Sequence, residues 1–167
     1  MLKRSSALAS AKPYTGKGIN IAEAPDFDLT QYAGAEKELK KALGKIPTRI
    51  GVVLEHDGRT QLRINPTQIW LISEAVKADA CISTPLSSSR TRIAIEGENA
   101  RAVLAKLAAI DFHPKQFKAD MFVQTAIHHT PALIHCVEEN AFHIYAMRTF
   151  ALSVWDAMTD AALEFAA

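Results

Sequence analysis

Cysteine, net charge and long apolar runs are what this sequence has least of. Cys81 and Cys136 are its only cysteines in 167 residues, and one possible disulfide is too few for a cystine-stabilised scaffold. We therefore expect the chain to work in a reducing compartment, the cytoplasm. The 19 Lys and Arg against 18 Asp and Glu give a formal charge of +1, so no overall field attracts nucleic acid or an anionic membrane. No stretch of about 18 consecutive apolar residues occurs, so we expect no membrane-spanning helix.

The remaining composition is that of an ordinary globular protein. Hydrophobic residues make up 49% of the chain and charged residues 22%, enough to bury a core in one domain or two small subdomains. Residues 73–89 show weak periodicity and end in a run of serines, which is typical of a connection. We predict an N-terminal subdomain over 1–86 and a C-terminal subdomain over 87–167, packed as one compact unit.

The first half combines strands with one helix. Residues 34–44 place Leu39 and Leu43 on one apolar face and end in Gly44, which is typical of a short surface helix. Asp57 and Gly58 favour the tight turn of a hairpin. The strands expected around them cover 50–55, 60–64, 68–72 and a short stretch near 80–83, after an extended segment over 18–33.

The second half repeats this order. An alternating strand is expected at 91–96, and Gly97 separates it from a helix over 99–109. The later pattern predicts strands at 121–128, 132–137 and 141–147 and a final helix over 150–165. This order predicts an α+β fold: two small subdomains of antiparallel sheet with helices on one face.

The last hairpin allows a register prediction. A turn at 138–140 sets Ile134 opposite Ile144 and Cys136 opposite Phe142, which makes one face of the hairpin apolar. The same register sets His135 opposite His143 on the other face.

That second face is a candidate contact surface. Leu133, His135, His143 and Tyr145 share it, and their mixed polarity suits an interface with the first subdomain or with a partner subunit. Arg148 joins the candidate interface because it lies between a strand end and a helix start, where a guanidinium can bind a carboxylate.

No catalytic, cofactor-binding or metal-binding residues are predicted. His128, His129, His135, Cys136 and His143 lie close in sequence, but adjacent strand residues point to opposite faces, so His135 and Cys136 cannot share an ion. Cys136 falls on the apolar face, where burial disfavours a nucleophilic thiolate. No phosphate-binding loop or dinucleotide-binding glycine turn occurs.

Residues 89–165 resemble the gamma subunit family of heterotetrameric sarcosine oxidase and of related complexes that demethylate N-methyl amino acids. The order and spacing of short matching segments carry the resemblance. These segments are Arg90-Thr91, Gly97, 100–106, 111–114 with Phe117, Gln124-Thr125, Pro131, 148–151, Trp155 and 160–162, with weaker similarity at 19–25 and 70–72.

The resemblance implies a noncatalytic subunit of a flavin-dependent complex. Such a complex oxidatively demethylates sarcosine or a similar N-methyl amine and passes a one-carbon unit to tetrahydrofolate. Its alpha and beta subunits are expected to hold the FAD, FMN, NAD and tetrahydrofolate sites and its delta subunit zinc, while gamma holds no cofactor and contacts alpha most directly. The family fold is similar to the folate-binding domain of glycine-cleavage aminomethyltransferase.

The chain departs from the family pattern in its middle. Residues 65–70 replace a Gly-Pro-Asp-Glu-Trp-like signature, and 73–89 is too short for the helix and strand expected there. We therefore expect a trimmed first subdomain.

Two other functions stay open. One is a free-standing protein that binds folate or transfers an aminomethyl group, which needs a buried carboxylate such as Asp111 or Asp120. The other is a metal hydrolase that uses the histidines. The substrate is not specified by the sequence.

Overall fold

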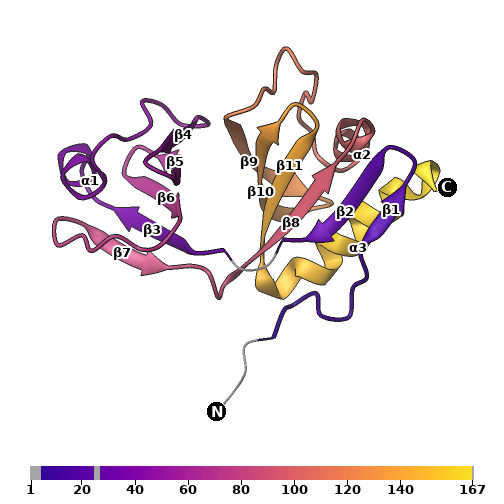
Figure 1. Ribbon diagram of the computed structural model, residues 1–167, viewed down its shortest axis with the longest axis horizontal. Helices are drawn as coiled ribbons and strands as arrows, with labels where there is room; N and C mark the ends of the chain where they lie inside the picture. The colour runs from indigo at the N-terminus through magenta and orange to yellow at the C-terminus, as the bar shows by residue number, and fades with distance from the viewer. Residues whose placement is uncertain (1–4, 25–26, 167) are drawn as a thin grey trace.

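The computed structural model describes residues 5–24 and 27–166, and it contains two antiparallel sheets (Figure 1). The larger sheet has six strands in the order β1 (Tyr14–Gly16), β2 (Ile19–Glu23), β8 (Arg90–Glu96), β11 (Ala141–Met147), β10 (Thr130–Glu138) and β9 (Met121–Ile127). The smaller sheet has five in the order β4 (Val53–His56), β5 (Arg59–Asn65), β6 (Gln68–Ile72), β3 (Leu29–Ala33) and β7 (Ile82–Pro85).

Helices cover the outer face of each sheet, so the layers run helix, sheet, sheet, helix (Figure 1). Helices α2 (Ala100–Leu107) and α3 (Ala151–Ala162) pack on the larger sheet, and 3₁₀ turns at Arg148–Phe150 and Leu163–Phe165 flank α3. Helix α1 (Glu36–Leu43) packs on the smaller sheet through Leu39 and Leu43. The predicted α+β fold with antiparallel sheets is confirmed.

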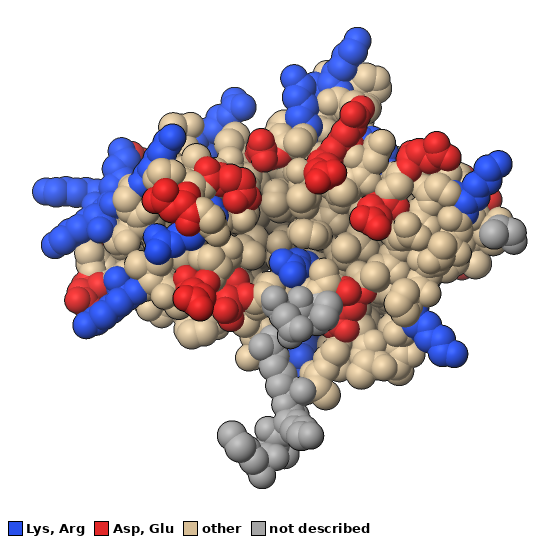
Figure 2. All heavy atoms as spheres, viewed as in Figure 1, with Lys and Arg blue, Asp and Glu red and all other residues tan. Residues whose placement is uncertain are grey.

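Charged side chains lie mainly on the outside of this arrangement, although Arg63 is buried. Figure 2 shows Lys and Arg extending from the end of the molecule that α1 occupies, with acidic side chains beside them. One such pair joins Lys40 to Glu36 at 2.7 Å, one helical turn apart. Among the described residues no helix is long and apolar enough to cross a membrane.

Three regions of buried apolar side chains hold the layers together. The largest lies between the larger sheet and its helices and includes Ile134, Phe142 and Trp155. A second lies under α1. The third lies between the two sheets, where side chains from both inner faces meet. Burial of the inner faces makes the two sheets one unit, because neither can expose this surface without losing its hydrophobic stabilisation.

Strand pairing crosses the boundary expected between residues 86 and 87. The strands β1 and β2 precede the boundary, yet β2 pairs with β8 through Ile21 opposite Ile95 and thus extends the larger sheet. The smaller sheet is built from residues 29–85 alone. The chain therefore starts in one sheet, forms the other and returns.

The register predicted for the last hairpin is confirmed. Ile134 lies opposite Ile144, Cys136 opposite Phe142, and His135 opposite His143, with a β-bulge between Cys136 and Glu138. The turn predicted at Asp57 and Gly58 is also present, with φ angles of 52° and 69°. Both angles are positive, as a type I′ hairpin turn requires.

Two strands lie later in the chain than expected. β4 begins at Val53 because Gly51 and Val52 instead join the edge of the larger sheet, where Val52 bridges Met121 and the N–H of Phe122 donates to Gly51. The strand expected near 80–83 is β7, at Ile82–Pro85. Between β6 and β7 the chain forms no helix, in agreement with the short 73–89 segment.

The loop after β6 is held by a tyrosine. The Tyr32 hydroxyl donates to the Val76 carbonyl oxygen and accepts from the Val76 N–H, each at 2.7 Å. Tyr32 is fully buried, and burial is the main reason that its pKa is raised. This pair of hydrogen bonds fixes the loop without a helix.

Gly97 sits at a close backbone contact between the β1–β2 turn and the start of α2. Its φ is 117°, and a Cβ there would lie 2.4 Å from the Gly18 carbonyl oxygen. We expect Gly97→Ala to lower the free energy of unfolding by about 2 kcal/mol, since strain at positive φ and a steric clash act together. Urea denaturation measures this loss.

Gly58→Ala is the matched control for Gly97→Ala. Gly58 also has positive φ, 69°, but nothing lies within 4 Å of its Cβ position. It should therefore show the conformational cost alone, about 1 kcal/mol. Equal losses at the two positions would show that the contact with Gly18 does not matter.

Candidate functional site

The face predicted as a contact surface lies inside the molecule, between the two sheets. Leu133 is 3% exposed and Tyr145 2%. Both belong to the buried apolar region that also includes Phe27, Leu62 and Trp70 of the first half. The ring of Tyr145 meets Phe27 and Trp70 edge-on, at centroid distances of 5.8 and 6.3 Å. The first half of the chain thus covers this face.

The two histidines of this face lie next to each other within the same layer. The rings of His135 and His143 are 6.2 Å apart between centroids. Burial lowers the pKa of each imidazole to about 4. The nearby His143 lowers the pKa of His135 further, and the nearby Arg92 lowers the pKa of His143 further. Nδ1 of His135 is buried without a hydrogen-bond partner in the described part of the chain. Both imidazoles are therefore neutral at pH 7.

Burial also acts on Tyr145, the third polar group of this face. It raises the pKa of the Tyr145 hydroxyl to about 12, against the opposing effect of a hydrogen bond with Arg92. The Arg92 guanidinium also lies 4.8 Å from the Phe27 ring centre and donates from Nε to the Ala24 carbonyl oxygen at 3.1 Å. Arg92 thus joins the inner face to the segment that leads into β3.

Arg148 lies apart from this face. Its backbone N–H donates to the Ser89 carbonyl oxygen at 2.9 Å, and its guanidinium donates to the Ser5 carbonyl oxygen. It therefore ties the 3₁₀ turn before α3 to the N-terminal segment.

The histidines do not form a ligand set with Cys136. Cys136 is buried in the apolar region under the helices, and burial raises the pKa of its thiol. His128 and His129 are exposed in the β9–β10 turn, at φ angles of 45° and 70°. In residues 5–24 and 27–166, no three His, Cys, Asp or Glu side chains converge as metal ligands would.

The two acids considered for a folate site are both exposed. Asp111 accepts a hydrogen bond from the His113 N–H at 2.8 Å, which orders the loop after α2. Asp120 has a φ of 62° and lies in the turn before β9. Neither carboxylate is buried as contact with a pterin ring would require.

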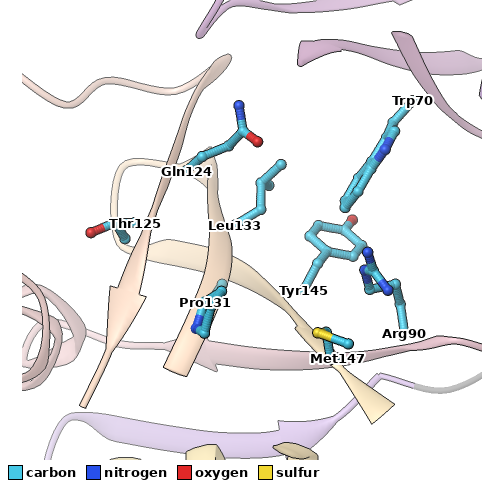
Figure 3. A pocket seen from close by; sticks show the side chains of 9 residues that line it. Trp70, Arg90, Gln124, Thr125, Pro131, Leu133, Tyr145 and Met147 are labelled. Carbon is cyan, nitrogen blue, oxygen red and sulfur yellow. The ribbon is translucent and has the colours of Figure 1, made fainter. Parts of the chain in front are cut away.

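A pocket of about 350 Å³ opens at one edge of the layer between the sheets (Figure 3). We call it the Arg90 pocket. It is lined by Trp70, Arg90, Gln124, Thr125, Pro131, Ala132, Leu133, Tyr145 and Met147. Figure 3 shows Trp70 and Tyr145 directed toward each other, with Arg90 beside them. The Arg90 guanidinium lies 5.5 Å from the Trp70 ring centre, within cation–π range.

The Arg90 pocket was not expected from the sequence, because its side chains come from β6, β8, β9, β10 and β11. From the sequence, Trp70 is interpreted as an aromatic residue of the core and Arg90 as a surface cation, so neither indicates a pocket. The segments that resemble the family include Trp70, Arg90, Gln124, Thr125 and Pro131. Their shared membership in that set was the available sequence signal for the pocket. The fold brings all five to one pocket.

The comparisons with known proteins agree with this fold. The family model described as "Sarcosine oxidase, gamma subunit family" matches residues 80–164. No curated protein matches the chain. Among solved structures, the fold is similar to a chain of the heterotetrameric sarcosine oxidase from Corynebacterium sp. U-96, solved in complex with pyrrole 2-carboxylate. The match covers 98% of this chain and 97% of that chain, with 22% sequence identity and a TM-score of 0.86.

A second solved structure shares the fold over a smaller part. The glycine cleavage system aminomethyltransferase T from Bartonella henselae is 16% identical, with a TM-score of 0.56. The match covers 86% of this chain but 46% of that one. Since the family model spans just over half of the residues, the chain belongs to the sarcosine oxidase gamma subunit family.

Proposed function

We propose that this chain is a noncatalytic gamma subunit of a heterotetrameric, flavin-dependent complex similar to sarcosine oxidase. The complex oxidatively demethylates sarcosine or a similar N-methyl amine and passes the one-carbon unit to tetrahydrofolate. Membership in the gamma subunit family carries the proposal. The similarity to a chain of heterotetrameric sarcosine oxidase over nearly the whole length of both chains supports it.

The distribution of cofactors among the subunits is part of the same proposal. The alpha and beta subunits hold FAD, FMN, NAD and tetrahydrofolate, the delta subunit holds zinc, and this chain contributes no cofactor. It packs against alpha, and the complex is cytoplasmic. The burial of His135 and Cys136, and the partial burial of His143, support a structural role for them. Neutral imidazoles and a protonated thiol held inside the fold are poorly placed to react with substrate.

Isolation of the assembled complex tests the proposal. The full chain carrying an affinity tag, purified gently from its own cells, should bring down larger subunits with the visible absorption of a flavin. The preparation should form formaldehyde from sarcosine or another N-methyl amine, or methylenetetrahydrofolate when tetrahydrofolate is added. An unrelated protein with the same tag is the control. A tagged chain that comes down without a flavoprotein would contradict the proposal.

A free-standing folate-binding protein is the second candidate function. The structural likeness to the glycine-cleavage aminomethyltransferase favours it. The exposed positions of Asp111 and Asp120 count against it, because a pterin ring is bound by a carboxylate sheltered from water. Calorimetric titration of the isolated chain with tetrahydrofolate separates the two candidates: binding in the micromolar range would favour the second.

A further inference from the structure

The Arg90 pocket holds a cation without an acidic partner. In the described part of the chain no ion pair includes Arg90, and its guanidinium donates only to the Ser89 carbonyl oxygen at 3.2 Å and the Ser89 hydroxyl at 3.3 Å. Partial burial lowers the pKa of this guanidinium. A partly desolvated cation is stabilised far more by a carboxylate than by neutral oxygens. None of the nine lining residues is Asp or Glu.

The apolar side chains of this region are of two kinds: exposed ones on β11 and the turn after it, and buried aromatic ones on the inner wall of the pocket. Met147 pairs with Arg90 across β8 and β11, and it is 40% exposed. Phe150, in the 3₁₀ turn that follows, is 46% exposed. Trp70 and Tyr145 form the inner wall. Aromatic residues, Met and Arg are the types most enriched where one protein docks on another.

Two of the polar side chains that line the pocket, Gln124 and Tyr145, already have hydrogen-bond partners within the chain. The Gln124 side-chain amide donates to the Ile64 carbonyl oxygen at 2.8 Å, and the Tyr145 hydroxyl is hydrogen bonded with Arg92. Small-molecule sites normally enclose the ligand and hold it with several convergent polar groups. A protein segment needs less, because its own backbone positions it. The observations therefore favour a protein partner.

We propose that the Arg90 pocket is the docking site for a partner subunit, which inserts an apolar side chain between Trp70 and Met147 and pairs an Asp or Glu carboxylate with Arg90. This inference rests on the proposed function, since the partner is a subunit of the flavin-dependent complex. It adds the surface used and the chemistry that the partner must present: an acidic segment with one apolar anchor.

Two substitutions test the docking site in the full tagged chain: one reverses the charge of Arg90 and the other places a charge at Met147. Arg90→Glu and Met147→Asp should each weaken assembly roughly 30-fold or more, the loss typical of an interface hot spot. Both side chains are partly exposed, so circular dichroism should show the fold unchanged. Arg59→Glu at the start of β5 changes the net charge by as much as Arg90→Glu, lies outside the pocket and should assemble as the wild type does.

A carbodiimide cross-link tests the carboxylate itself. Arg90→Lys keeps the positive charge and supplies an amine, so the reagent should join position 90 to one Asp or Glu of the partner, found by mass spectrometry. Ser88→Lys, an exposed position outside the pocket, is the control and should give no such link. Loss of assembly in Arg90→Glu without a cross-link in Arg90→Lys would overturn the carboxylate partner.

The outcomes separate this inference from the proposed function. A wild-type chain that brings down no flavoprotein refutes the proposed function and the docking site with it. A wild-type chain and variants that assemble equally well refute the docking site alone. Micromolar tetrahydrofolate binding that Arg90→Glu abolishes would show that the pocket takes a small ligand, and the docking proposal would be wrong.

Discussion

Replacing Arg101 with leucine is expected to lower the free energy of unfolding by roughly 3 kcal/mol, because one guanidinium holds three separate segments together. Nη1 donates to the carbonyl oxygens of Phe112 and Phe117, and Nε donates to that of Glu139 at 2.8 Å. The same group lies 5.0 Å from the ring centre of Phe142. Leucine keeps only the apolar character of the arginine stem and leaves these carbonyl oxygens without their donor.

Arg101→Lys is the matched variant. Lysine keeps the charge but has a single ammonium in place of a planar fork, so it can satisfy only part of the set. In urea denaturation, we expect its free energy of unfolding to lie between those of the wild type and the leucine variant. Assembled complexes that contain Arg101→Leu should be fewer, with turnover per flavin unchanged. A leucine variant as stable as the wild type would show that water replaces the guanidinium at no cost.

Local patterns in the sequence were sufficient for much of the larger sheet. The register of the last hairpin follows from the alternation of apolar residues, because a shift by one position would turn Ile134 and Phe142 away from the helices. The turn at Asp57 and Gly58 follows from the few residues that accept positive φ. Both are short-range features, set by neighbours in the sequence.

Long-range pairing could not be predicted in the same way. Ile21 and Ile95 are far apart in the chain, and nothing in either strand specifies that β2 pairs with β8 rather than with β3. The bridge between Val52 and Met121, which joins the sheet edges, is equally nonlocal. Such contacts depend on which surfaces the whole fold leaves available, and the Arg90 pocket arises in the same way.

The mixed polarity of one strand face did indicate an interface, but not which surface covers it. Leu133 and Tyr145 would expose apolar area if the sheet stood alone, which is why a covering surface was expected. The structure places the first half of the chain there. His135 is then buried and His143 partly buried beside them, and their loss of hydration makes the stability of the fold depend on pH.

Acidification from pH 7 to pH 4 is expected to remove on the order of 5 kcal/mol of folding free energy through His135 and His143. The pKa of each is lowered to about 4 in the folded chain, below the ordinary value of 6.5 for an unperturbed imidazole. Between these values the unfolded chain binds more protons than the folded chain. The stability is therefore complete above pH 6.5 and falls as the pH drops toward 4.

A double variant, His135→Leu with His143→Gln, isolates this effect. It removes both imidazoles, so urea midpoints measured from pH 7 to pH 5 should change much less than those of the wild type. His56→Gln, at an exposed position at the end of β4, leaves both imidazoles of the inner face in place and should keep the wild-type fall in stability. Glu36 does not interfere in this range. Lys40 and Arg63 lower its pKa to about 2, so Glu36 affects the free energy of unfolding only as the pH falls from about 4.5 toward 2. Parallel curves for the wild type and the double variant would show that the two sheets separate, or admit water, before the histidines are protonated.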